Sequence, residues 1–386
     1  MAHAAQPLQL AHQMDGRFGH NSYLMMGTRE LGDVNTPAML RVCGTPANPL
    51  PFFRHPNGRR TSQFRSLKLN SPSLSQTAKK MSINNNSSKT EEKIAVVTGA
   101  NKGIGFETVR QLARQGVTVI LTARDEKRGI EATASIKGEV GRVIFHQLDV
   151  RDPDSVASLA QFIQTEFGRL DILVNNAGAS GVIVDVEGLK ALKIDPMTWL
   201  SGKATNIVQG VIQQTYEAAE VCLDTNYYGC KRVTQALIPL LQRSTFGARI
   251  VNVSSLRSEL GRIPNEETRS KLANVDNLTE EGLETLLQRF LEDLKHGVIE
   301  AKGWCMMLPA YSISKAVLNA YTRVLAKRYP DMCINCVHPG YVDTDINWHT
   351  GPMTVEEGAK GPVMLALLPN GGPSGRYFDQ TEMAEF

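Results

Sequence analysis

The sequence predicts an α/β fold with a doubly wound parallel sheet. Short apolar segments alternate with helical segments along most of the chain, and only a few residues separate them. Such near-continuous apolar strands are typical of parallel sheets, because helices cover both of their faces. In addition, a glycine-rich turn lies between the first strand and the first helix, which is the arrangement of a nucleotide-binding βα unit.

The elements follow one another from residue 93 nearly to the carboxyl terminus. Strands are predicted at 93–98, 117–123, 142–148, 170–174, 249–253, 333–337 and 376–378. Helices are predicted at 104–115, 126–136, 155–167, 216–243 and 311–329. We therefore predict a single domain over residues 91–386, without internal repeats.

Residues 1–90 are predicted to be a disordered extension, because they are rich in Ser, Asn, Pro and Gly and lack periodicity. Residues 41–80 contain eight basic residues and no acidic one, a composition that resembles an organelle transit peptide, such as a chloroplast one. Early acidic residues and Met81 favour instead an extended or alternative amino terminus on a cytoplasmic protein. Both interpretations remain open.

Composition excludes several function classes. Residues 1–80 carry 10 Lys and Arg against 3 Asp and Glu, so residues 81–386 carry 32 against 36, a net charge of −4. A mildly acidic domain has no electrostatic basis for nucleic-acid binding. No apolar run approaches the ~20 residues that cross a bilayer, so no membrane partner is predicted.

Six cysteines in 386 residues are too few for a disulfide scaffold and fit a reducing compartment. Cys333 and Cys336 form a CxxC pair but lie on a predicted strand. Residues three apart on a strand point to opposite faces. We therefore predict no metal site.

The glycine turn is the first candidate site. Gly99, Gly103 and Gly105 would let the backbone approach a pyrophosphate, whose charge the helix amino terminus favours. The turn also contains Asn101, Lys102 and Ile104. A glycine turn without a ligand is the alternative interpretation.

Residues after the next two strands indicate which dinucleotide would bind. Arg124 follows the second strand, where an arginine accommodates the 2′-phosphate of NADP and an acidic residue would select NAD. Lys102 is a second cation, and Asp149 is placed to hydrogen-bond the adenine. NADP is favoured, although Arg124 could be a solvated arginine and Asp149 a helix-flanking residue.

Tyr311 and Lys315 lie four residues apart, on one face of a predicted helix. An isolated tyrosine has a pKa of ~10, and a nearby positive charge lowers it. The pair therefore indicates a tyrosine prepared for acid–base catalysis. Alone, the pattern also fits a solvated helix face.

Several motifs now occur in one order: the glycine turn, Asn175-Asn-Ala-Gly178, Asn226, Ser255, Tyr311 with Lys315, and Pro339-Gly-Tyr-Val-Asp-Thr344. Together they resemble the short-chain dehydrogenase/reductase superfamily, and in particular the monomeric carbonyl reductases and plant reductases of the menthone/neomenthol and salutaridine type. The resemblance implies a Rossmann fold and reversible NADPH-dependent reduction of a ketone or aldehyde to an alcohol.

The resemblance also implies residue roles. Tyr311 would donate the proton, Lys315 would bind the nicotinamide ribose, and Ser255 would hydrogen-bond the carbonyl oxygen. Asn226 would hold a relay water beside Lys315. Asn176 and Gly178 would line the cofactor floor, and Pro339, Val342 and Thr344 the nicotinamide site. Considered singly, Ser255 could instead be a serine that caps the end of a strand, and Asn226 could be an amide on a helix surface.

Residues 256–308 form an insertion before the catalytic tyrosine. Its apolar residues Leu283, Leu286, Leu287, Phe290, Leu291 and Leu294 have helical spacing. Thr279 is a candidate amino-terminal cap. We expect this helix to pack on its own domain and to cover the tyrosine as a lid. By resemblance it implies a monomer, with a dimer as the alternative.

The substrate is the least determined feature. The segments 179–214 and 341–354 and the insertion should shape the pocket. They contain Trp199, Trp304, Met306, Met307 and Trp348, which suggests a small apolar carbonyl compound, although core packing explains these residues equally well. A non-catalytic NADP-binding scaffold and an extended-type epimerase are the competing functions.

Overall fold

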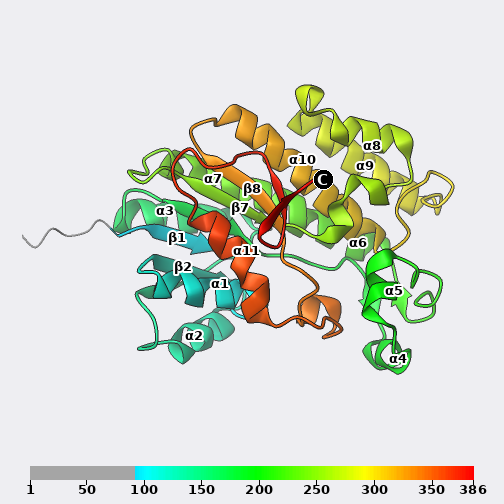
Figure 1. Cartoon of the computed structure of the whole chain (residues 1–386), viewed down its shortest axis with the longest axis horizontal. Coiled ribbons are helices and arrows are strands. Elements are labelled where there is room, and N and C mark those ends of the chain that lie inside the picture. The colour runs from blue at the N-terminus through cyan, green and yellow to red at the C-terminus, as the bar shows by residue number, and fades with distance from the viewer. Residues whose placement is uncertain (1–91) are drawn as a thin grey trace, which may run out of the picture. The chain divides into compact units, whose positions relative to one another are not determined.

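An eight-stranded sheet forms the centre of the protein in a computed structural model that describes residues 92–386 (Figure 1). The predictions about residues 1–90, disorder and the two interpretations of the amino terminus, concern a segment outside the described residues. They remain predictions.

The sheet is parallel except at one edge. Its strand order is β10-β9-β8-β7-β4-β1-β2-β3, and only the pair β9 and β10 is antiparallel. The strands are β1 (Ile94–Val97), β2 (Thr118–Ala123), β3 (Val143–Gln147), β4 (Ile172–Asn175), β7 (Arg249–Val253), β8 (Cys333–His338), β9 (Tyr377–Asp379) and β10 (Glu382–Ala384). The strand order reverses between β1 and β4, and in such sheets ligands bind at the carboxyl ends of the strands around this point. The predicted doubly wound sheet is confirmed.

Successive residues along each strand point to opposite faces of the sheet, so the core consists of two layers. Val96 and Leu173 belong to one apolar cluster, whereas their neighbours Val97 and Val174 belong to the other. The first cluster includes residues of α3 (Pro153–Glu166), α7 (Cys230–Leu241) and α10 (Pro309–Arg328). The second includes residues of α1 (Gly103–Arg114), α2 (Glu126–Ser135) and α11 (Val355–Ala366). Helices therefore cover both faces, which explains why the strands are apolar throughout.

One predicted helix is not continuous. The segment predicted as a helix at 216–243 consists of α6 (Tyr216–Leu223), a π-helical turn η1 (Asp224–Gly229) and α7. The π turn adds backbone length that no hydrophobic period reveals. Such turns are frequent at functional sites, and this one contains Asn226.

The inserted segment forms helices α8 (Glu266–Ala273) and α9 (Glu280–Lys295), which lie beside α10 (Figure 1). The predicted apolar stripe is confirmed: Leu283, Leu287 and Phe290 are buried against α6 and α10. Thr279 caps α9, because its hydroxyl accepts a hydrogen bond from the Gly282 amide at 3.0 Å. The expected lid over Tyr311 is wrong, since α9 packs on α6 and α10 and no residue of α9 lines the cavity described below.

Several elements, most of them short, were not predicted. They are α4 (Val186–Ala191), α5 (Pro196–Ser201), the hairpin of β5 (Ile183–Val184) and β6 (Ile212–Gln213), the 3-10 turns η2 (Leu256–Ser258), η3 (Leu260–Arg262), η4 (Val275–Asn277) and η5 (Asp345–Asn347), and also α11 and β10. Figure 1 shows α4 and α5 set apart from the strands β1 and β2. Among residues 92–386, no helix is long and apolar enough to span a bilayer.

Candidate active site

The glycine turn joins β1 to the amino terminus of α1. Gly99 and Gly103 adopt positive φ angles of +62° and +59°, which other residues rarely tolerate. A side chain at Gly105 would lie 2.3 Å from the Asn176 amide nitrogen. That nitrogen donates hydrogen bonds of 3.0 Å to the carbonyls of Thr98 and Gly99. Asn176 therefore fastens the turn to the end of β4, and the first amides of α1 are left facing the cavity as an anion site.

A cavity of about 620 Å³ extends along the carboxyl ends of the strands. All the predicted site residues except Asn226 line it. They are Gly99, Asn101, Lys102, Gly103, Ile104, Gly105, Arg124, Asp149, Asn176, Gly178, Ser255, Tyr311, Lys315, Pro339, Val342 and Thr344. Segments separated by more than 200 residues in the sequence thus meet at one edge of the sheet.

Asn226 lies behind the cavity wall and is 1% exposed. Its amide nitrogen donates to the Ala179 carbonyl at 3.0 Å and to the Ser314 hydroxyl at 2.9 Å. Its amide oxygen accepts from the Ala179 backbone at 2.8 Å. Both polar atoms of the side chain already have protein partners, so the residue ties η1 to the loop after β4 and to α10. The expected role of Asn226, holding a relay water beside Lys315, stays a prediction.

Tyr311 and Lys315 lie one turn apart on α10, as predicted. The Lys315 ammonium donates to the Val253 carbonyl at 2.8 Å and lies 5.7 Å from the centre of the Tyr311 ring. A side chain at Gly178 would approach this ammonium to 3.8 Å. The end of β7, the loop after β4 and α10 therefore enclose the lysine, which is 3% exposed.

Burial dominates the titration of both groups. It raises the pKa of Tyr311 to about 12, although a hydrogen bond with Ser255 and the charge of Arg257 lower it in part. Burial also lowers the pKa of Lys315 to about 8. The prediction that Lys315 brings the tyrosine pKa below its ordinary value is therefore wrong for this structure. Tyr311 is therefore a protonated phenol at neutral pH, and Ser255 lies close enough to affect its pKa.

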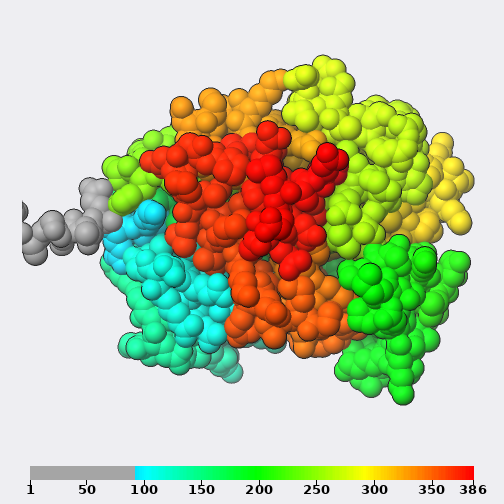
Figure 2. Space-filling view, in the orientation of Figure 1, coloured from blue at the N-terminus to red at the C-terminus, as the bar shows by residue number. Residues whose placement is uncertain are grey.

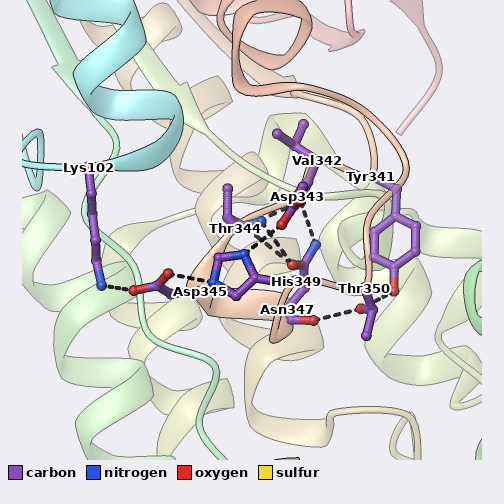
Figure 3. Close-up of polar contacts among 9 residues, drawn as sticks. All are labelled: Lys102, Tyr341, Val342, Asp343, Thr344, Asp345, Asn347, His349 and Thr350. Atoms are coloured by element: carbon purple, nitrogen blue, oxygen red, sulfur yellow. Dashed lines mark hydrogen bonds and ion pairs between the residues drawn. The ribbon is translucent and has the colours of Figure 1, made fainter. Parts of the chain in front are cut away.

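At the other end of the cavity, two cations have different surroundings. The Arg124 side chain is exposed and has no ion-pair partner among residues 92–386. Lys102 instead forms an ion pair with Asp345 of η5 (Figure 3). His349 contacts the same carboxylate at 3.0 Å and Asp343 at 2.6 Å. Of the two predicted 2′-phosphate ligands, Arg124 is free, whereas Lys102 is engaged across the mouth of the cavity.

Asp149 is also partly engaged. One of its carboxylate oxygens accepts from the Arg151 backbone at 3.0 Å, which stabilises the turn before α3. The residue still lines the cavity, beyond β3. Its position agrees with the adenine site and with the helix-flanking alternative alike.

The loop after β8 closes the cavity. Figure 2 shows this orange segment between the cyan region of α1 and α2 and the green region of α4 and α5. Asn347 holds the loop, because its amide donates to the Val342 carbonyl at 2.6 Å (Figure 3). The next two residues, Trp348 and His349, both have positive φ angles, of 56° and 62°. Adjacent left-handed residues store backbone strain, which is typical of ligand sites.

Residues beyond Tyr311 form the wider, apolar end. The rings of Trp199 and Trp348 meet edge to face with centres 6.3 Å apart, and both line the cavity. Trp304 does not line it, because it packs on Phe290 in the core. Met306 and Met307 line a neighbouring pocket instead. The predicted set of substrate residues is therefore correct only in part.

The sequence predictions missed two polar residues of this apolar end, Arg257 and His338. Both are buried. Their only signal in the sequence is position: Arg257 follows Ser255 by two residues, and His338 directly precedes Pro339. Among residues 92–386, no group of His, Cys, Asp or Glu side chains is arranged to hold a metal ion.

A glycine turn suited to a phosphate, a buried lysine, a tyrosine and a serine all line one cavity on a doubly wound sheet. Together they define an oxidoreductase that binds a nicotinamide cofactor. The chain belongs to the short-chain dehydrogenase/reductase family, as the following comparisons show. A sequence profile described as "short chain dehydrogenase" matches residues 93–267.

Two curated relatives and one solved structure support this assignment. "Short-chain dehydrogenase/reductase 1" of Saponaria officinalis is 54% identical over 300 residues, which cover 77% of this chain and 97% of the relative. A (+)-neomenthol dehydrogenase of Arabidopsis thaliana is 49% identical, covering 76% and 97%. The structure of salutaridine reductase from Papaver somniferum is 46% identical, with a TM-score of 0.70, and covers 75% of this chain and 99% of that one. The resemblance to the plant reductases is confirmed.

The buried ammonium of Lys315 should make stability depend on pH. Its folded-state pKa of about 8 lies below the ordinary 10.5, so the charge destabilises the fold below pH 8 and the cost disappears as pH rises toward 10.5. We expect Lys315→Met to gain stability relative to the parent at pH 7, and this advantage to shrink by about 2 to 3 kcal/mol at pH 10.

Urea unfolding of both proteins at the two pH values measures this difference. Other groups titrate in both proteins, so their effect cancels in the difference between the two unfolding free energies. Loss of the hydrogen bond to Val253 changes that difference by the same amount at both pH values. A stability difference that is the same at pH 7 and pH 10 would contradict the assigned pKa.

Proposed function

We propose that this protein reduces the carbonyl group of a ketone or aldehyde to an alcohol, reversibly and with NADPH, and that Tyr311 donates the proton. One observation carries the proposal: Tyr311, Ser255 and Lys315 line the same cavity as the glycine turn and Arg124, and the Lys315 ammonium lies 5.7 Å from the centre of the Tyr311 ring. Proton donor and dinucleotide site thus share one enclosed space.

The residues present fit NADPH. The glycine turn, closed to side chains at Gly105 by Asn176, leaves backbone amides for the pyrophosphate, and the unpaired Arg124 suits the 2′-phosphate. Lys102, Asp149, Pro339, Val342 and Thr344 complete the proposed binding set. When bound, the cofactor supplies the hydride.

The protein's own part is acid catalysis and orientation. Ser255 and Tyr311 would both hydrogen-bond the carbonyl oxygen, so that charge developing there is stabilised. The raised pKa of Tyr311 keeps its proton in place until transfer. After transfer, the phenolate would lie beside the Lys315 ammonium, which is 3% exposed, and burial of this charge strengthens the attraction. Positioned proton transfer typically contributes ~10²- to 10⁴-fold.

Replacing the proton donor tests this assignment. Tyr311→Phe should lower kcat by ~10²- to 10⁴-fold, with NADPH affinity changed by no more than about threefold, when NADPH oxidation is followed with a panel of ketones. Tyr329→Phe, at the carboxyl end of the same helix, is the matched control and should behave like the parent.

Unchanged turnover in Tyr311→Phe would exclude this residue as the acid. A parent protein that binds NADPH tightly but reduces no ketone or aldehyde would favour the competing function, a non-catalytic NADP-binding scaffold.

Arg124 should determine the choice of cofactor. Arg124→Asp removes the proposed 2′-phosphate partner and adds a carboxylate that can accept from a ribose hydroxyl, so NADPH affinity should fall at least about tenfold and NADH affinity should rise. Fluorescence titration with both cofactors measures the ratio. Arg128→Asp is the control, since this exposed arginine pairs with Asp125 outside the cavity. Equal ratios in both variants would refute the role of Arg124.

We also propose a small, mainly apolar carbonyl substrate and a monomeric enzyme. The walls formed by Trp199 and Trp348 support the first, as do relatives named for neomenthol and salutaridine. The buried stripe of α9 supports the second, because it covers α6 and α10 from within the same chain. Sedimentation velocity at micromolar concentration should give the mass of one chain. A dimer mass would contradict the proposal.

A further inference from the structure

Arg257 is a buried charge that the proposed chemistry does not use. It lies on η2, two residues after Ser255, is 6% exposed, and lines the cavity. Within residues 92–386 its guanidinium has no carboxylate partner, and its side chain donates to one protein acceptor, the Trp199 carbonyl. A guanidinium carries five N–H donors. Its other N–H groups have no protein acceptor within residues 92–386, and Arg257 lines both this cavity and the neighbouring pocket.

Such an arrangement is costly without a ligand. A buried charge or donor that lacks a partner destabilises a protein by several kcal/mol. Burial and the neighbouring charge of Arg262 both lower the pKa of Arg257, which expresses the same cost. The cavity therefore contains a cation that an acceptor oxygen of a ligand would stabilise.

His338 supplies a second polar group at this end. It lies at the end of β8, is 8% exposed, and its Nδ1 atom has no hydrogen-bond partner among the described residues. Burial and the charges of Arg262 and Arg257 lower the pKa of His338 to about 4, against the opposite effect of Asp379. The ring is thus neutral and adds no charge to the cavity wall. Because Nδ1 is closed to solvent, the ring would hydrogen-bond a ligand through Nε2.

The remaining walls here are apolar, formed by Trp199, Leu256, Leu308 and Trp348. An apolar pocket by itself discriminates weakly between similar substrates, whereas one with buried polar groups rejects analogues that cannot pair with them. Arg257 can also form a bidentate pair with a carboxylate, the strongest of its hydrogen-bonding arrangements.

We propose that Arg257 selects, among apolar ketones, those that carry a second acceptor oxygen away from the reacting carbonyl, most strongly a carboxylate, with His338 as an additional partner. This inference rests on the proposed reductase function and names the substrate class of the same site.

A structural role of Arg257 has to be separated from this one. By binding the Trp199 carbonyl it also caps the carboxyl end of α5. Arg262 does the same at the next residue, donating to the Leu200 carbonyl at 2.8 Å, but it is paired with Glu259 and does not line the cavity. Arg262→Met is therefore a matched control that loosens α5 without removing a side chain that lines the cavity.

The test compares ketones of one skeleton: 3- and 4-methylcyclohexanone against 3- and 4-oxocyclohexanecarboxylate, with NADPH. For at least one pair, the parent should favour the carboxylate at least about tenfold in kcat/KM. Arg257→Met should abolish or invert this ratio, Arg257→Lys should retain part of it, and Arg262→Met should leave it intact. The ratio cancels any general loss of activity.

Two outcomes would overturn the inference: a parent that prefers the methyl ketones in both pairs, or equal loss of the ratio in Arg257→Met and Arg262→Met. Binding of cyclohexanecarboxylate, followed by tryptophan fluorescence, separates this inference from the reductase proposal. If no ketone is reduced but this acid binds the parent at least tenfold more tightly than Arg257→Met, the reductase proposal fails and the site stands. Equal binding to parent and variant would refute the site.

Discussion

The site depends on the hydrogen bonds that Asn176 makes across the sheet. One amide group bonds two successive carbonyls at the end of β1, and therefore joins the first half of the sheet to the second where the strand order reverses. The same amide occupies the space that a side chain at Gly105 would need. The shape of the glycine turn, the direction of α1 and the mouth of the cavity all follow from this contact.

Two buried cations, Lys315 and Arg257, also line the cavity, and neither forms an ion pair with a carboxylate within residues 92–386. Backbone carbonyls hold both: Val253 for the lysine and Trp199 for the arginine. Carbonyl dipoles orient a cation without neutralising it, so each keeps its charge available to whatever enters the cavity. Natural proteins often tolerate such costs at functional sites, where stability is lost in exchange for preorganised charge.

The predictable features were the local ones. The glycine turn, Arg124 and the Tyr311–Lys315 pair depend on neighbours in sequence or on one helix turn, so their residue types alone carried the signal. The pKa of Tyr311 was wrongly predicted because it depends on burial by distant segments, which outweighs one nearby charge. The lid was wrongly predicted because an amphipathic stripe shows that a helix packs, not on which side. Arg257 and His338 belong to no motif, and only folding brings them to the cavity.

The ion pair between Lys102 and Asp345 attaches the loop after β8 to the glycine turn. Both side chains are 54% exposed, so dissolved ions reach the pair and weaken it as the Debye length shortens. The hydrogen bond from Asn347 to the Val342 carbonyl, within the same loop, is partly buried and therefore better shielded from dissolved ions. The loop therefore keeps its internal shape while its attachment to the glycine turn varies with ionic strength.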